Sequence, residues 1–219
     1  MPRRKAHRDC QPDMTKKRMA ASFRRARGGQ LDQLELLPGL GEVDIGRSGF
    51  IFRNRTHLDS TRLRRMFLDA IPGWPTVGLS VLVRYSRGSD FSGACYYQTG
   101  RIFVNLGRSN SYPYRLLTYA AAARTTRFGW QREIHSMELA DAYQLALFIF
   151  LHEFYHWLVK KAGRNTRQKE GMCDRFATRV LTDRWGAVLT DPDGRPVERS
   201  DWDFQDLDGF VAGALRHRR

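Results

Sequence analysis

The sequence predicts an α+β fold, with a small mixed or antiparallel sheet followed by long helices. Short β-branched and apolar runs separated by turn residues occupy mainly the first half of the chain, whereas the strongest helical periodicity begins at Leu139. The 219 residues suit one domain with an appendage, and 42% hydrophobic and 12% aromatic residues are enough for a core. A wholly disordered basic protein is therefore excluded.

The first half of the chain contains four strand candidates and one helix. Apolar residues recur at helical spacing between Leu63 and Ile71, and Pro72-Gly73 then stops the helix. Thr99-Gly100 separates two strand candidates and predicts a hairpin turn. The expected elements are a strand at Gly49–Arg53, a helix from Asp59 or Ser60 to Ile71, and strands at Val77–Tyr85, Ser92–Gln98 and Arg101–Leu106.

The second half is dominated by helices. Leu139–Ala162 is the clearest helical pattern, and Gly163 ends it. Asn165 is expected to cap the next helix, which runs to about Asp183, with Gln168 completing the cap. The weaker patterns predict a helix at Leu116–Ala123, an irregular segment at Thr125–Ile134, a turn at Asp191–Gly194 between short strands, and an amphipathic helix at Asp203–His217.

Positive charge is concentrated at the N-terminus. The formal net charge is +14, and residues 1–30 hold ten Lys or Arg against two acids, so this segment carries +8. Gly28-Gly29 would act as a hinge between a basic flexible arm at 1–30 and a domain at 31–219. Such an arm binds DNA or RNA without sequence preference, or serves only as a solubilising tail. The residues expected to contact phosphates are Arg3, Arg4, Lys5, Lys16, Lys17, Arg18, Arg24, Arg25 and Arg27.

Cysteine content and hydropathy bear on the cellular compartment. Three cysteines without a Cys-x-x-Cys pair favour a reducing environment. No apolar stretch follows the positive N-terminus, so a secretory signal is not expected. The longest uninterrupted apolar run, Leu145–Leu151, is far shorter than a membrane span. We therefore expect a soluble cytoplasmic protein with no membrane partner, while its oligomeric state stays open.

Residues 152–156 read His-Glu-Phe-Tyr-His and carry the strongest chemical signal. On a helix, His152 and His156 lie one turn apart on the same face and can bind one zinc ion together. Glu153 projects beside them, where it can act on a metal-activated water as general base. This composition would produce the pattern by chance roughly 0.005 times per chain.

Acidic residues on the next helix would complete the site. Zinc in a hydrolytic site usually takes three protein ligands and leaves one position for water. Glu170 follows His156 after a short turn, and its helical stripe also holds Cys173 and Asp174 among apolar residues. Carboxylates are rarely buried without a partner, because desolvating them is costly. We therefore expect Glu170 to bind the metal and Asp174 to accept a ring N–H from one histidine.

A purely structural interpretation stays open. His152 and His156 belong to a continuous apolar stripe between residues 145 and 159, so both could be satisfied core residues. A zinc ion can also be kept for structure alone. The histidine pair, the interposed Glu153 and the downstream acids favour a catalytic metal site. Cys173 is expected to be a small core residue.

The pattern His152-Glu153-x-x-His156 followed by Glu170-x-x-x-Asp174 resembles that of the gluzincin metallopeptidases. Phe176-Ala177 and Val180-Leu181 continue it in the manner of small bacterial and phage gluzincins, which include the ImmA/IrrE-like family and the minigluzincins. This resemblance implies a zincin-like fold with an active-site helix and a following ligand helix. It also implies zinc held by both histidines and Glu170, with Asp174 supporting a zinc-bound histidine.

The segments Gly93–Tyr97 and Gly100–Asn105 are similar to the hairpin that precedes the active helix in the same group. In those relatives the second strand of the hairpin lies at the sheet edge, beside the cleft. The resemblance therefore implies that residues 101–106 pair with an extended peptide substrate. The substrate-binding residues expected on this strand are Arg101, Phe103 and Asn105.

Two functions of different classes follow. The first is a small intracellular zinc-dependent metallopeptidase that acts on a protein or peptide, with Glu153 as general base and the basic arm as a recruiter to nucleic acid. The second is a non-catalytic nucleic-acid-binding regulator or structural protein with a structural zinc ion. Glu153 favours the enzyme, because a structural site has no use for a general base. The oxyanion donor stays unassigned among Tyr155, His135 and several arginines.

Overall fold

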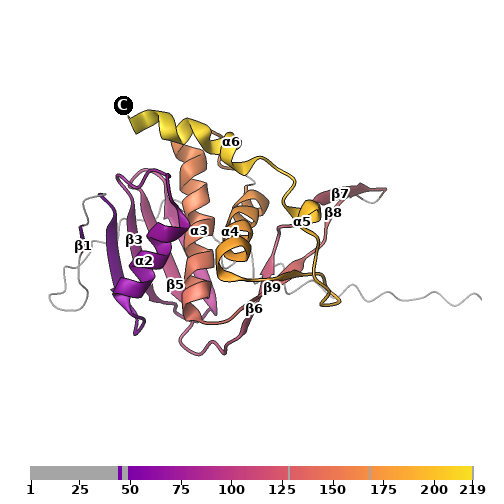
Figure 1. The fold of residues 1–219 in the computed structure, drawn as a ribbon, viewed down its shortest axis with the longest axis horizontal. Helices are drawn as coiled ribbons and strands as arrows, with labels where there is room; N and C mark the ends of the chain where they lie inside the picture. The colour runs from indigo at the N-terminus through magenta and orange to yellow at the C-terminus, as the bar shows by residue number, and fades with distance from the viewer. Residues whose placement is uncertain (1–43, 46–48, 128, 168, 219) are drawn as a thin grey trace, which may run out of the picture.

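A computed structural model describes residues 44–45, 49–127, 129–167 and 169–218 (Figure 1). The expected basic arm at residues 1–30 lies outside the described residues. The strands are β1 (Asp44–Ile45), β2 (Ile51–Arg55), β3 (Ser80–Tyr85), β4 (Phe91–Tyr96), β5 (Arg101–Leu106), β6 (Tyr114–Thr118), β7 (Ala123–Thr126), β8 (Gly129–Arg132), β9 (His135–Leu139) and β10 (Leu189–Thr190). The helices are α2 (Ser60–Ala70), α3 (Ala142–Lys161), α4 (Glu170–Trp185), α5 (Arg199–Trp202) and α6 (Leu207–Val211), followed by the 3-10 helix η1 (Ala212–Arg218).

The main sheet has five strands in the order β1-β2-β3-β5-β4. β3 runs parallel to β2 and β5, whereas β1 and β4 pair antiparallel with their neighbours. This confirms the expected α+β class with a mixed sheet. β4 and β5 form the expected hairpin, and β4 is the last strand of the order, so one of its edges has no strand partner in the described part of the chain.

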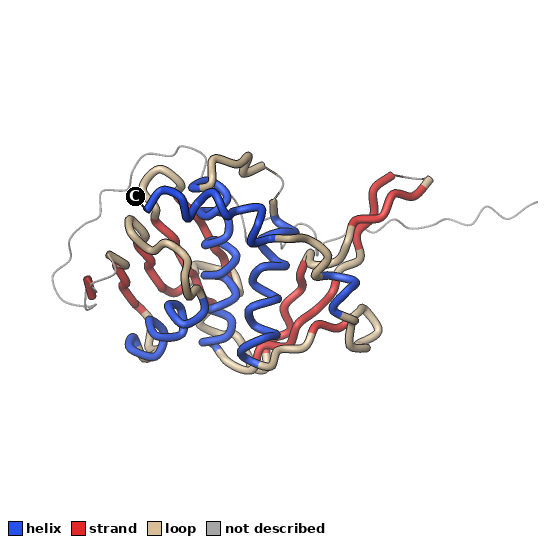
Figure 2. Tube along the Cα trace, turned by 45° about the horizontal axis from the view of Figure 1, so that its top comes forward, coloured by secondary structure: helices blue, strands red, loops and turns tan. Residues whose placement is uncertain are grey.

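α2 and α3 cover one side of this sheet (Figures 1 and 2). Asp59 caps α2 through its carboxylate, which accepts a hydrogen bond from the Arg62 amide at 2.6 Å. Asp141 caps α3 in the same way by accepting from the Gln144 amide at 2.9 Å. Every residue of α3 from Leu145 to Val159 is buried, because the sheet, α2 and α4 surround it. α3 is therefore the central helix of the core.

The prediction that Asn165 caps α4 is wrong. α4 begins at Glu170, its N-cap position is Lys169, and no side chain caps it. Asn165 accepts a hydrogen bond from the Arg167 amide at 2.9 Å and so belongs to the preceding turn. At the other end, Gly186 stops the helix in the left-handed conformation with φ of 66°. Glu170 thereby lies at the first residue of α4, next to the turn that joins it to α3.

The segment from Tyr114 to Leu139 carries the four strands β6 to β9, so the helix predicted at Leu116–Ala123 and the irregular segment predicted at Thr125–Ile134 are both wrong. β6 pairs antiparallel with β9, and β9 with β10, in a three-stranded sheet. Leu116 and Thr118 of β6 are both buried, with the period of a strand. The alanines that resemble a helix follow this strand, and the pairing of β6 with β9 overrides their propensity.

β7 and β8 form a separate hairpin that projects from the body of the molecule (Figures 1 and 2). The C-terminal segment is less regular than predicted. Instead of one helix at Asp203–His217, the chain forms the short α6 and then η1. None of the helices in the described part of the chain is long and apolar enough to span a membrane.

Candidate metal centre

The candidate metal centre lies between α3 and α4, which run side by side (Figure 2). α3 presents His152 and His156 one turn apart, with their ring centroids separated by 5.0 Å, and both residues are buried. Because α4 begins at Glu170, its first turn brings that carboxylate against the two imidazoles. The two buried histidines therefore meet the half-exposed carboxylate of Glu170 at the edge of the core.

These three side chains are spaced as ligands of a shared ion. His152 Nε2 lies 3.3 Å from one carboxylate oxygen of Glu170, and His156 Nε2 lies 3.5 Å from the other. Two atoms bound tetrahedrally to one zinc ion at about 2.0–2.1 Å are about 3.3 Å apart. N–H···O hydrogen bonds are shorter, at about 2.9–3.0 Å. The observed separations fit a common metal better than direct hydrogen bonds.

Asp174 lies behind His152, where the sequence predicts it. One carboxylate oxygen is 2.7 Å from His152 Nδ1, and the other accepts hydrogen bonds from the Tyr119 amide at 2.6 Å and the Thr118 hydroxyl at 3.2 Å. An ionised Asp174 requires the proton to be on Nδ1, which leaves the lone pair of Nε2 for a metal. Among the described residues His156 Nδ1 has no hydrogen-bond partner, so the support that they provide is specific to His152.

The carboxylates of Glu153, Glu170 and Asp174 converge on the site, and their negative charge favours a positive charge there. Burial opposes protonation of His152, but Asp174 and Glu170 outweigh it and raise the pKa of His152 to about 10. Burial would raise the pKa of Glu170, but both histidines hold it far below its usual range. Burial raises the pKa of Glu153, an effect that the histidines oppose. A divalent cation would supply the positive charge that these acids favour.

Cys173 is a ligand candidate that the sequence reasoning missed. Its Sγ and one ring nitrogen from each of His152 and His156 all lie within 4.8 Å of one another, and all three residues are buried. This His152–His156–Cys173 cluster could hold a metal ion. Cys173 follows Glu170 by three positions, so helical spacing alone places both on one face of α4. That spacing is the sequence signal that could have identified Cys173 as a ligand candidate. The apolar residues around Cys173 are also typical of a cysteine in a core.

Glu153 lies on the side of α3 that faces β4. A Cβ atom at Gly93 of β4 would lie 2.8 Å from Cγ and 3.0 Å from Cδ of Glu153, which is too close for carbon atoms. Gly93 therefore leaves the space that the Glu153 side chain occupies. Cys95 lies on the same face of β4, and burial together with the nearby Glu153 raises the pKa of its thiol. The carboxylate is thus held in a largely dry position next to the histidines.

The predicted substrate strand is not at the edge of the sheet. β5 pairs with β3 on one side and β4 on the other, so its main chain is already bonded along both edges. The resemblance assigned the edge to the wrong strand of the hairpin, because among the described strands it is β4 that ends the sheet next to Glu153. The side chains of Arg101, Phe103 and Asn105 lie on the sheet face opposite α3, because Ile102 and Val104 point into the core. The structure does not bring these three residues to the candidate metal centre.

The structure reduces the number of residues that could donate a hydrogen bond to an oxyanion at this site. The Tyr155 hydroxyl is buried and donates to the Leu207 carbonyl at 2.9 Å, so its proton is already used in a bond to α6. His135 is also buried, and burial lowers its pKa. Arg132 at the end of β8 donates to the Tyr119 carbonyl at 3.4 Å and lies against Gly171, where an added Cβ would be 3.1 Å from its Cζ. Arg132 is thus an exposed guanidinium next to the turn that carries Glu170.

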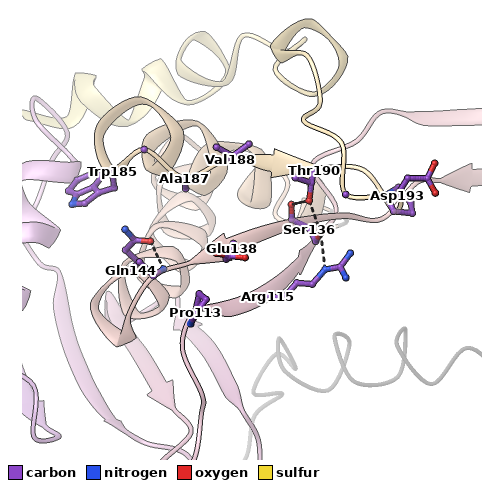
Figure 3. A pocket seen from close by; sticks show the side chains of 14 residues that line it. Pro113, Arg115, Ser136, Glu138, Gln144, Trp185, Ala187, Val188, Thr190 and Asp193 are labelled. Carbon is purple, nitrogen blue, oxygen red and sulfur yellow. Dashed lines mark hydrogen bonds between the residues drawn. The ribbon is translucent and has the colours of Figure 1, made fainter.

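A cavity of about 870 Å³ lies elsewhere, on the outer face of the three-stranded sheet. Arg115, Ser136 and Glu138 line it together with Trp185 from the end of α4 (Figure 3). Arg115 Nε donates to Ser136 Oγ at 3.1 Å, and Ser136 Oγ lies 2.9 Å from the Thr190 hydroxyl. Its polar groups bond largely to one another, and it includes none of the proposed metal ligands.

The chain matches no known protein family, no curated protein and no solved structure. Its function is therefore argued from the arrangement of its own residues.

Proposed function

We propose that this chain is an intracellular zinc-dependent metallopeptidase with a gluzincin-type site on a zincin-like fold. The observation that carries the proposal is the position of Glu170, whose two oxygens face the Nε2 atoms of His152 and His156 at 3.3 and 3.5 Å. Two imidazoles and one carboxylate are a common ligand set of hydrolytic zinc, and they leave a coordination position open. Recruitment to DNA or RNA by the basic residues 1–30 remains part of this proposal.

Bound zinc would polarise a peptide carbonyl and lower the pKa of water. Glu153 is the general base, because it neighbours both histidines without belonging to the ligand set. Its burial raises its pKa, which suits a group that accepts a proton from water and returns it to the leaving amine. The edge of β4, which no strand in the described part of the chain pairs with, would bind an extended substrate, since Gly93 of this strand lies against Glu153.

The test of catalysis is Glu153→Gln. This variant should keep its fold and metal content and lose about 10²- to 10⁴-fold in cleavage rate, which is the usual contribution of a general base. Glu138→Gln, an exposed glutamate on β9, is the matched control and should cleave as the parent does. Cleavage is measured on a library of fluorogenic peptides with zinc-loaded protein. If Glu153→Gln cleaves as fast as the control, the proposed role of Glu153 is wrong.

A second candidate is a structural zinc site in a non-catalytic regulator. The observation in its favour is Cys173, which forms a buried three-residue cluster with the two histidines. A thiolate there, with Glu170 as the fourth ligand, would make a closed site. Cobalt(II)-substituted protein distinguishes the two, since thiolate ligation gives an intense near-ultraviolet charge-transfer band. Catalysis predicts no such band in the parent. A band lost in Cys173→Ser and kept in Cys95→Ser would favour the structural site.

A further inference from the structure

We propose that Arg132 binds a carboxylate of the peptide substrate next to the candidate metal centre, and that Arg175 strengthens this carboxylate subsite with a second positive charge. The inference rests on the proposed peptidase function and names its substrate class, which is peptides with a free C-terminal carboxylate or an acidic side chain near the scissile bond. Arg132 is the last residue of β8, in the projecting hairpin (Figure 1). Arg175 lies in the second turn of α4.

Gly171 places Arg132 close to the proposed ligand Glu170. Gly171 and Glu170 are consecutive in α4, so their Cα atoms are about 3.8 Å apart. A Cβ atom at Gly171 would lie 3.1 Å from Cζ of Arg132 and would overlap its Nη1. The missing side chain therefore leaves room for the guanidinium against the first turn of α4. Arg132 itself is exposed, so a substrate can reach it.

Arg132 and Arg175 are bonded to consecutive residues of one segment. Arg132 Nη1 donates to the Tyr119 carbonyl at 3.4 Å, and Arg175 Nη1 donates to the Ala120 carbonyl at 3.0 Å. The Tyr119 amide donates at 2.6 Å to Asp174, the carboxylate behind the candidate metal centre. One stretch of main chain after β6 thus contacts both guanidinium groups and the carboxylate that supports the metal centre.

The positive charge of Arg175 has only neutral hydrogen-bond partners among the described residues. Arg175 donates to Gln205 Oε1 at 2.5 Å, and its Cζ lies 4.6 Å from the centre of the Phe204 ring. The residue is 3% exposed, and a buried charge is costly unless an opposite charge compensates it. Burial and the nearby charge of Arg132 lower the pKa of Arg175 to about 10, an effect that Asp174 partly offsets. An anion bound to Arg132 would reduce the repulsion between the two arginines.

A carboxylate is the substrate group that matches Arg132. The guanidinium presents its N–H groups in a planar fork that fits the two oxygens of a carboxylate. The hydrogen bond to Tyr119 uses one N–H group of Arg132, and the remaining groups can donate to a substrate. A peptide carries carboxylates at its C-terminus and on Asp or Glu side chains. Both sources share the same chemistry, so the experiment separates them.

The test measures Kd for matched peptides by isothermal titration calorimetry. The protein is the zinc-loaded full chain with Glu153→Gln, so that peptides are not consumed. One pair of peptides differs only in a C-terminal carboxylate or amide. A second pair, blocked at both ends, differs only in one Glu or Gln. The acidic member of at least one pair should bind about 10- to 150-fold more tightly, the effect of hydrogen bonds to a charged group. The pair that shows the preference identifies the source of the carboxylate.

Arg132→Gln in the same background should abolish this preference, and Arg132→Lys should keep part of it, because lysine retains the charge without the fork. Arg124→Gln is the matched control. Arg124 is an exposed arginine of the same hairpin, and its strand partner is Gln131, so it lies on the opposite face from Arg132. The control should keep the full preference. Circular dichroism and zinc content check that each variant is folded.

The inference is overturned if neither pair shows a preference, or if Arg132→Gln keeps the preference that the control shows. It is also overturned if Arg132→Gln weakens the acidic and the neutral peptide equally, because the guanidinium would then contact a group that both peptides share. Failure of the peptidase proposal gives a different result. In that case the protein with Glu153 intact cleaves none of these peptides, whatever their values of Kd.

Discussion

Asp174 is buried in the second turn of α4, and its two carboxylate oxygens have different partners. One oxygen holds His152 Nδ1, and the other holds the main chain at Tyr119 and the hydroxyl of Thr118. The second set of bonds fixes the carboxylate, and the carboxylate fixes the imidazole. The orientation of His152 thus depends on residues at the end of β6 that lie outside the candidate ligand set.

Asp174→Asn should weaken zinc binding by about 10- to 100-fold, the usual effect of removing a hydrogen-bond partner of a ligating histidine. Thr118→Val should have a smaller effect in the same direction, because it removes one of the two donors to Asp174. Competition with a chromophoric chelator measures both affinities. Asp183→Asn, on an exposed part of the same helix, is the control and should bind zinc as the parent does. Equal affinity for Asp174→Asn and this control would contradict the assigned role.

Gly93→Ala should reduce peptide cleavage by about 100-fold, because the new methyl group displaces the Glu153 side chain from its place beside the histidines. Zinc content should not change, since neither residue is in the ligand set. Ala94→Ser makes a change of similar size on the other face of β4 and should leave cleavage intact. The comparison is made by single-turnover kinetics. If Gly93→Ala cleaves peptides as fast as the parent, Glu153 does not need the space that the missing side chain of Gly93 leaves.

Residues of the site differ in how far sequence predicts them. His152, His156, Glu170 and Asp174 lie on two consecutive helices, and helical periodicity is enough to bring them together. Gly93 lies on a strand, and its contact with Glu153 depends on strand register and on how α3 packs on the sheet. One sequence does not contain that information. Cys173 lies between these two cases. Its helical spacing from Glu170 can be read from the sequence, but a buried cysteine can be either a core residue or a metal ligand.

At the scale of elements, α3 is held by aromatic packing against α2 and the residue just before β2. The Phe150 ring stacks on Phe67 of α2 at a centroid distance of 4.3 Å and meets Phe50 edge-on at 6.4 Å. All three rings are buried. This cluster fixes the rotation of α3 and therefore the direction in which its histidines point.

Phe150→Ala should lower the free energy of unfolding by about 3–5 kcal/mol, the usual cost of a phenylalanine-sized cavity. Val188→Ala, at a position that is 52% exposed, should change it by less than about 0.5 kcal/mol. Urea unfolding of both proteins at saturating zinc measures the difference. A cost for Phe150→Ala as small as that of the control would show that this cluster does not support α3.

Elements were predictable where local pattern and tertiary pairing agree. The residues of α2, α3 and the β4–β5 hairpin carry their own periodicity and stop signals. β6 does not, because its alternation is short and is followed by alanines that favour a helix. Which strand of the hairpin lies at the edge is decided by β3, whose parallel pairing with β5 is a long-range contact.

At the scale of the whole molecule, the metal centre joins α3 to α4 and, through Asp174, to the three-stranded sheet. Three carboxylates, those of Glu153, Glu170 and Asp174, converge there around two histidines that offset part of their negative charge. A metal bound here would therefore link α3, α4 and the three-stranded sheet. In the described part of the chain, no other buried ionic site joins these three parts.

Metal removal should consequently lower the thermal midpoint. At a free zinc concentration about 100 times its Kd, binding stabilises the fold by about 2.7 kcal/mol, which corresponds to about 5–10 °C for a domain of this size. Scanning calorimetry with zinc and with chelator measures the difference. Glu170→Ala should abolish this increment. A midpoint that is equal with and without zinc would contradict metal binding at this site.

β4 divides its side chains between two environments by parity alone. Odd positions such as Gly93 and Cys95 face α3, and even positions such as Ser92 and Tyr96 face the other way. A shift of β4 by one residue relative to β5 would exchange the two sets, whereas a shift of two would preserve both. The register of this one strand pair therefore decides at once which side chains lie against Glu153 and which lie on the opposite side of the sheet.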